Sequence, residues 1–160
     1  MAKELTNSNI DRQNILNNQY AIMEIQKAVQ LQGIVFENKL VFVIDKLADF
    51  FEVTAKTIKN YLKRYKAELN SNGYEVLKGK RLEEFKLYAK WSDVKEKDFL
   101  NIKISQLGIF DFRAFLNIGM LLVESERARL LRLLSVIRNL FSYPEIFLRR
   151  VKPIAQICHF

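Results

Sequence analysis

The stretch from Ile44 to Arg64 carries the pattern that most constrains how this chain can fold. Its apolar residues recur at helical spacing in two short runs, which predicts two amphipathic helices that face one core. The first run is Ile44, Leu47, Ala48 and Phe51, and the second is Ile58, Tyr61 and Leu62. Residues 52–54 lie between the runs and are expected to form a tight turn. We therefore interpret residues 44–64 as a helix-turn-helix.

The residues of the turn support this interpretation, with one departure. Thr54 can cap the second helix with its hydroxyl, and the β-branched Val53 is expected to anchor the turn beneath both helices. The small side chain of Ala48 lets the helices cross closely. Glu52 is the departure, because many such turns carry Gly there to reach a left-handed backbone conformation without steric cost. Since the motif tolerates other residues at this position, we retain the interpretation.

The residues expected to face outward from the second helix favour binding to DNA. They are Thr54, Ala55, Lys56, Lys59, Asn60, Lys63 and Arg64. This set contains four cations and no acid, and Lys and Arg side chains neutralise phosphates. Asn60 offers the paired donor and acceptor that can bind adenine in the major groove. The alternative is a solvated face of a helical hairpin with incidental lysines. Spacing and charge agree in favouring a DNA-binding helix-turn-helix.

Composition limits the other classes of function. The chain has 160 residues, 49% of them hydrophobic, which suits a single domain with a terminal extension. Its net charge of +8 favours an anionic partner, either nucleic acid or a membrane surface. No apolar run approaches the roughly 18 residues of a membrane span, and the opening residues lack the apolar segment of a secretion signal. We expect a cytoplasmic protein that does not enter a membrane. One cysteine and one histidine provide neither a disulfide nor a metal site, so we expect no cofactor.

The first 32 residues are predicted to form one long helix. Its apolar positions lie on a single stripe from about Ser8 to Gln32. Ser8 or Asn9 can cap its start, and Gly33 can stop it. Packing on the following domain is the expected role of this helix, with self-association as the alternative.

A small sheet is expected around the helix-turn-helix. Residues 34–43 alternate as a short β-hairpin, and residues 74–77 as a strand. The second helix of the motif is expected to continue to about Leu69. Residues 78–81 are interpreted as a basic turn that could act as a wing touching a phosphate, followed by a helix. The cations of this wing are Lys80 and Arg81. The predicted fold is mainly α with a small β-sheet, a winged helix-turn-helix-like domain flanked by N- and C-terminal helices.

Enzymatic activity is not expected. The carboxylates that might form an acid and base pair are Asp93, Glu96 and Asp98, or Glu83 with Glu84. They are interleaved with lysines, as in a solvated surface, and no Cys or His lies beside them. The five glycines are scattered singly, so no phosphate-binding loop is present.

The C-terminal half predicts a strand over residues 101–112, a helix capped by Asp111 and a last helix capped by Ser125. The last helix has a broad leucine-rich face. Such a face more often packs in the core of a protein than in an interface between proteins. That face is still our candidate surface for a homodimer through residues 125–141. Residues 142–160 contain two prolines and no periodicity, and are expected to be irregular. The resulting division is an N-terminal helix over 1–32, the DNA-binding domain over 33–141 and the tail.

Three phrases in this order resemble the N-terminal DNA-binding region of RhuM-like bacterial proteins and related phage antirepressor (Bro/KilA-like) modules. They are LADFFEVTAKTIKNYLK, NGYEV and FRAFLNIGMLLVESERAR. The last is the most specific, and the resemblance covers about residues 8–138. It implies a DNA-binding protein of a mobile element or defence locus, with Thr54, Lys56, Lys59, Asn60 and Lys63 as the reading face. Some longer relatives continue into a Fic-like region with a His-Pro-Phe motif, which this chain lacks.

The leading interpretation is therefore a non-enzymatic, sequence-specific DNA-binding protein that acts in transcription regulation and binds double-stranded DNA. Two alternatives stay open. One is an antirepressor-like interaction module that binds a protein through its C-terminal helices. The other is a detached regulatory domain of a longer protein.

Overall fold

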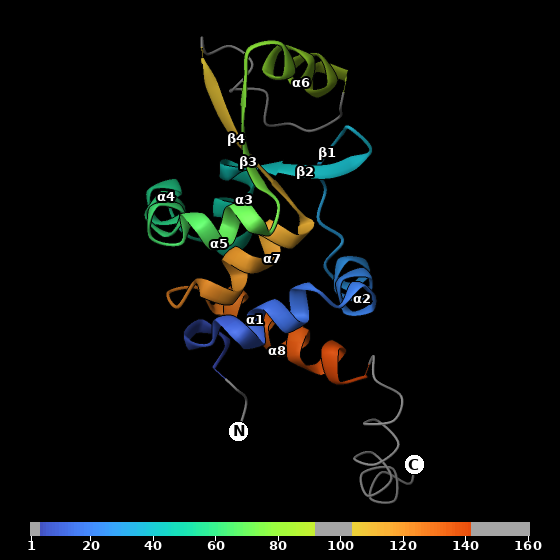
Figure 1. The fold of residues 1–160 in the computed structure, drawn as a ribbon, viewed down its shortest axis with the longest axis vertical. Helices are drawn as coiled ribbons and strands as arrows, with labels where there is room; N and C mark the ends of the chain where they lie inside the picture. Colours follow the sequence, from blue (N-terminus) through green and yellow to red (C-terminus); the bar gives the residue numbers. More distant parts are fainter. Residues whose placement is uncertain (1–3, 92–103, 142–160) are drawn as a thin grey trace, which may run out of the picture.

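The computed structural model describes residues 4–91 and 104–141. It is mainly helical, with a small four-stranded antiparallel sheet, as the sequence predicts (Figure 1). The predicted irregular tail and the carboxylates Asp93, Glu96 and Asp98 lie outside the described residues.

The sheet consists of β1 (Ile34–Phe36), β2 (Lys39–Val43), β3 (Tyr74–Lys78) and β4 (Gln106–Asp111) in the spatial order β1-β2-β4-β3. Strand β4 therefore pairs with both β2 and β3. The hairpin expected over residues 34–43 is confirmed. Its two turn residues, Glu37 and Asn38, have φ of 50° and 64°, the left-handed values that two-residue hairpin turns need.

The expectation of one long N-terminal helix is wrong. A short 3-10 turn, η1 (Leu5–Asn7), is followed by two helices, α1 (Asn9–Leu16) and α2 (Gln19–Val29). Ser8 caps α1 as predicted, but Asn18 is extended and its side chain accepts a hydrogen bond from the amide of Ala21. An Asn that caps a new helix cannot also continue the previous one. Helix α2 ends at Gln30 in a left-handed conformation, before Gly33 is reached.

The middle of the chain forms α3 (Ile44–Phe51), α4 (Ala55–Arg64) and α5 (Lys66–Ser71). The second helix of the predicted pair was expected to run on to Leu69. It breaks instead at Tyr65, whose φ of −115° and ψ of 31° are not helical. The change of direction lets Leu69 reach the core, where it is fully buried.

The remaining helices are α6 (Gly79–Trp91), α7 (Phe112–Leu121) and α8 (Glu126–Phe141). Both predicted caps are present. The Asp111 carboxylate accepts a hydrogen bond from the amide of Ala114 at 2.8 Å, and the Ser125 hydroxyl accepts one from the amide of Ala128 at 3.1 Å.

Two hydrophobic clusters use opposite faces of the sheet. The larger cluster gathers side chains from α1 to α5, α7 and α8, with Phe42 and Phe110 from the sheet. The smaller one packs α6 onto the other face, where Phe36 and Phe85 meet edge to face with centroids 5.4 Å apart. The larger cluster holds α3 and α4 in place. Among the described helices, none combines the length and apolarity needed to cross a bilayer.

Candidate nucleic-acid interface

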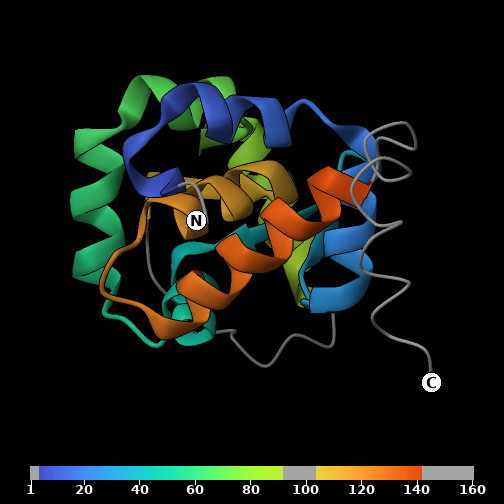
Figure 2. The ribbon, with the colours of Figure 1, turned by 90° about the horizontal axis from the view of Figure 1, so that it is seen from below.

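Helix α4 has one buried side and one exposed side. Ile58 is fully buried and Tyr61 nearly so, which confirms the predicted register. The seven residues predicted to face outward all belong to this helix or its cap. Thr54, Lys56, Lys59, Asn60, Lys63 and Arg64 are exposed, and Ala55 is half-buried. The structure therefore brings these residues together on one surface, which we call the α4 surface. In Figure 2 this helix lies along one edge of the molecule.

The turn between α3 and α4 places Glu52 in the left-handed region, with φ of 56° and ψ of 42°. Gly adopts this conformation without strain in many such turns. For Glu52 the same conformation is sterically unfavourable by about 1 kcal/mol. The amide of Val53 donates to the carbonyl of Ala48 at 3.0 Å, which closes the turn. Thr54 caps α4 as predicted, since its hydroxyl accepts from the amide of Thr57 at 3.2 Å.

The cations of the α4 surface have no carboxylate partner among the described residues. Lys56, Lys59 and Lys63 make no ion pair with another described residue, while the Arg64 guanidinium lies 5.3 Å from the centre of the Tyr65 ring. Helix α3 instead exposes the carboxylates Asp45 and Asp49. Positive charge is therefore concentrated on α4 and not spread over the helix pair. Such a surface attracts an anion without first breaking internal contacts.

The predicted basic wing is not a turn. Strand β3 runs to Lys78 and α6 begins at Gly79, so Lys80 and Arg81 occupy the first turn of a helix. The Arg81 guanidinium is paired with Glu37 at 2.8 Å and Glu75 at 3.1 Å, and its hydrogen bond lowers the pKa of Glu37. Figure 1 shows α6 well apart from α4. The structure therefore does not join these two cations to the α4 surface.

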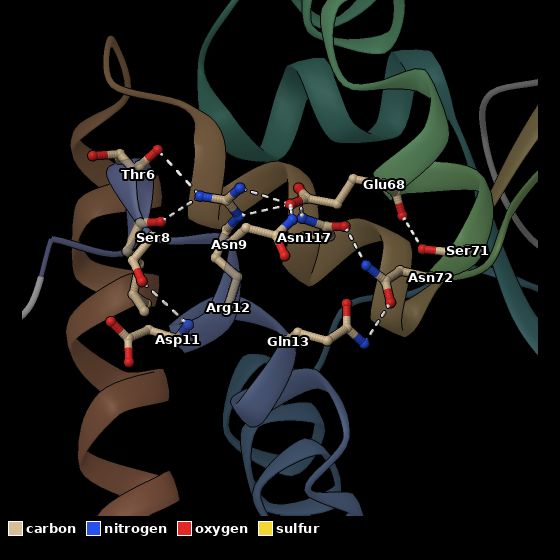
Figure 3. A network of polar contacts seen from close by, with 11 residues as sticks. Thr6, Ser8, Asn9, Asp11, Arg12, Gln13, Glu68, Ser71, Asn72 and Asn117 are labelled. Carbon is tan, nitrogen blue, oxygen red and sulfur yellow. Dashed lines mark hydrogen bonds and ion pairs between the residues drawn. The ribbon is translucent and has the colours of Figure 1, made fainter.

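A buried polar network joins α1 to α5 and α7 and was not foreseen from the sequence (Figure 3). Arg12 of α1 is only 4% exposed. Its guanidinium contacts Glu68 of α5 at 2.6 Å and donates to the carbonyl of Leu5 at 2.7 Å. The amide of Asn9 also donates to Glu68. This ion pair fastens the N-terminal helix to the helix that follows α4.

The network continues through amide side chains. Asn117 of α7 donates to the second oxygen of Glu68 at 2.9 Å and accepts from Asn72 at 2.8 Å. Gln13 of α1 donates to Asn72 at 3.2 Å. Because the side chains that bond to one another in this network lie 45 or more residues apart in the chain, no local pattern could have revealed the set. Its groups are bonded to one another, so its role is to join α1, α5 and α7.

The described residues contain no group of three or more His, Cys, Asp or Glu side chains that could hold a metal ion. A small hollow of about 170 Å³ does adjoin the α4 surface, lined by Asn60, Tyr61, Arg64 and Glu124. No protein-family model, curated protein or solved structure matches this chain.

Proposed function

We propose that this chain is a sequence-specific DNA-binding protein whose helices α3 and α4 form a helix-turn-helix, with α4 entering the major groove. The observation that carries the proposal is the α4 surface, with four cations that take part in no ion pair with a described residue. Cations without a carboxylate partner remain available to phosphates. The resemblance of residues 112–129 to RhuM-like proteins supports the same proposal, and implies a regulator at a mobile-element or defence locus.

The exposed residues of α4 have two roles in this proposal. Lys56, Lys63 and Arg64 hold phosphates, which fixes the position of α4 on the duplex but reads no sequence. Asn60 lies among these cations and donates to and accepts from an adenine edge. Strand β2 packs against α3, and Lys80 and Arg81 form no basic wing beside α4.

The two roles are separable by experiment. Sequences bound by the protein are first selected from a random DNA pool, and affinities for a selected and a scrambled duplex are then measured by fluorescence anisotropy at several salt concentrations. Lys63→Ala should weaken both duplexes alike and flatten the plot of log affinity against log salt by about 1 unit. Asn60→Ala should cost about 1 to 3 kcal/mol on the selected duplex alone.

Arg81→Ala is the matched control, because it removes a cation that the fold already engages. It should leave the salt slope unchanged. Undiminished DNA binding by a variant with Lys56, Lys63 and Arg64 all changed to Ala would show that DNA does not bind at the α4 surface. If Lys63→Ala and Asn60→Ala had equal effects on affinity for both duplexes, the interaction with DNA would be non-specific and electrostatic.

A second copy of the chain is proposed as the partner of α8. This helix buries Ala128 and Leu131 but leaves Leu130, Leu133, Ile137 and Leu140 exposed by 51%, 44%, 39% and 41%. Their spacing of three and four residues is that of a seam between two helices. DNA-binding helix-turn-helix proteins commonly read two half-sites as dimers. Sedimentation at micromolar concentration, with and without DNA, tests this proposal. A protein that is monomeric in both cases would contradict the dimer but not the DNA-binding proposal.

The same apolar seam favours the second candidate function, an interaction module that binds a repressor through α8. In that case the selection experiment enriches no DNA sequence, and the protein is not retained on DNA even at low salt.

A further inference from the structure

The start of α8 makes several polar contacts with the α3–α4 pair. We call residues 123–127, which include the loop after α7 and the first residues of α8, the clamp. Figure 2 shows this segment passing beside α4 before α8 begins near α3. The Ser125 hydroxyl caps α8 and also donates to the carbonyl of Phe51, the last residue of α3, at 2.7 Å. The same hydroxyl therefore joins the start of one helix to the end of another.

Arg127 secures the turn itself. Its guanidinium donates to the carbonyl of Phe50 at 3.2 Å and pairs with the carboxylate of Glu52 at 3.2 Å. Glu52 is the residue in the left-handed conformation. The clamp therefore contacts both the end of α3 and the residue that sets the angle between α3 and α4.

One clamp contact reaches α4 directly. The Tyr61 hydroxyl donates to Glu124 at 2.8 Å and accepts from the amide of Val123 at 3.4 Å. Burial, together with the hydrogen bond to Glu124, raises the pKa of Tyr61 above its ordinary value. Tyr61 is nearly buried on the inner side of α4, whereas Glu124 is exposed.

We propose that Glu124 is a positioning residue, which fixes the orientation of α4 for DNA reading through its hydrogen bond with Tyr61. This inference rests on the proposed function and assigns that function a residue outside α4. The position of Glu124 is unfavourable on charge alone. Its carboxylate lines the same hollow as Asn60 and Arg64, where it repels phosphates. Positioning and charge therefore have opposite effects on affinity, and this makes them distinguishable.

The test compares three substitutions with the control Glu126→Ala. Glu126 is also an exposed carboxylate of the same segment, but its contact is with Arg129 on α8. Glu124→Ala and Tyr61→Phe should each weaken the selected duplex about three- to ten-fold, the range of one lost hydrogen bond. Neither should weaken the scrambled duplex. Glu124→Gln retains an acceptor without the charge and should bind at least as tightly as the unchanged protein.

The double variant Tyr61→Phe, Glu124→Ala should lose no more affinity than either single variant, because both remove the same bond. Tighter binding of the selected duplex by Glu124→Ala, equal to that of Glu126→Ala, would overturn the inference. So would additive losses in the double variant.

Amide hydrogen exchange supplies a measurement that does not depend on DNA. Glu124→Ala should accelerate exchange in α4 and leave α7 unchanged, whereas Glu126→Ala should change neither. If the unchanged protein binds no duplex, the proposed function fails, and exchange still decides whether the contact orders α4. Identical α4 exchange in the Glu124 and Glu126 variants would show that it does not.

Discussion

Helices α4 and α5 follow one another in the chain, and both are rich in polar residues, yet they use them differently. Helix α5 turns Glu68 inward, where Arg12 and Asn117 bond it. Helix α4 turns its lysines outward, where no described residue pairs with them. Charges that are bonded to one another join elements of the fold, while charges without partners remain available to a ligand. The candidate interface is therefore identified by what its cations do not contact.

The largest expected loss of stability comes from placing a carboxylate in the buried side of α4. Glu68 of α5 is a carboxylate that has bonding partners, whereas a new one in α4 would have none. Ile58 is fully buried. Ile58→Asp should reduce the free energy of unfolding by about 4 kcal/mol or more, because the carboxylate would lie in the core with nothing to bond it. Urea denaturation measures this loss. The neighbouring exposed control, Lys59→Asp, should stay within about 0.5 kcal/mol of the unchanged protein. An unfolding midpoint unaffected by Ile58→Asp would mean that the register of α4 is wrong.

A somewhat smaller loss of unfolding free energy is expected from removing Arg12, the cation that pairs with Glu68 of α5. Arg12→Ala leaves Glu68 with Asn9 and Asn117 but no cation. Breaking a buried ion pair in this way typically costs about 3 to 5 kcal/mol. The same denaturation experiment applies, with Lys66→Ala as the control, since Lys66 is an exposed cation of α5. A loss no larger than that of the control would show that the network does not hold α1 in place.

The smallest expected effect on stability concerns Asp111. Its carboxylate is bonded less completely than Glu68 of α5, but unlike the lysines of α4 it has a partner among the described residues. It is partly buried, and its hydrogen bond with Ala114 only partly compensates for the loss of water. Burial raises the pKa of Asp111 above its ordinary value, so folding favours the protonated form. The stabilising contribution is present at low pH and is lost as the pH rises through the raised pKa.

Asp111→Asn retains an oxygen that can cap α7 but does not titrate. Its stability relative to the unchanged protein should therefore improve between about pH 4 and pH 7, where a carboxyl of raised pKa ionises. Unfolding midpoints at the two pH values measure this change. A difference between the two proteins that is independent of pH would contradict the role given to burial.

Features that depend on neighbouring residues were predictable from the sequence. The hairpin, the inward position of Ile58 and the caps at Ser8, Thr54, Asp111 and Ser125 all follow from spacing and from side chains that reach an amide three residues away. The break at Asn18 was within reach of the same reasoning. It was missed because the apolar stripe continues across it, while Asn18 caps a new helix.

Features that depend on distant residues were not predictable. Arg81 looks like a free cation in the sequence, and only the folded sheet brings Glu37, 44 residues away, to it. Glu68 likewise looks like a surface acid until α1 packs against it. The candidate site shows the same limit, because Glu124 lies 63 residues from Tyr61 and its contact appears only in the folded chain.

The position of β4 has a consequence for the order of folding. The β1–β2 hairpin joins neighbouring residues and can form as soon as the ribosome releases it. Strand β3 must wait, because its partner in the sheet is β4, which lies between β2 and β3 in space but follows both in sequence. The helix pair sits between β2 and β3 in the chain, and so does not acquire its complete support until residues 106–111 have been synthesised. Long-range pairing of this kind slows folding. A nascent chain that carries α4 but not yet β4 therefore presents the basic helix before the framework that orients it.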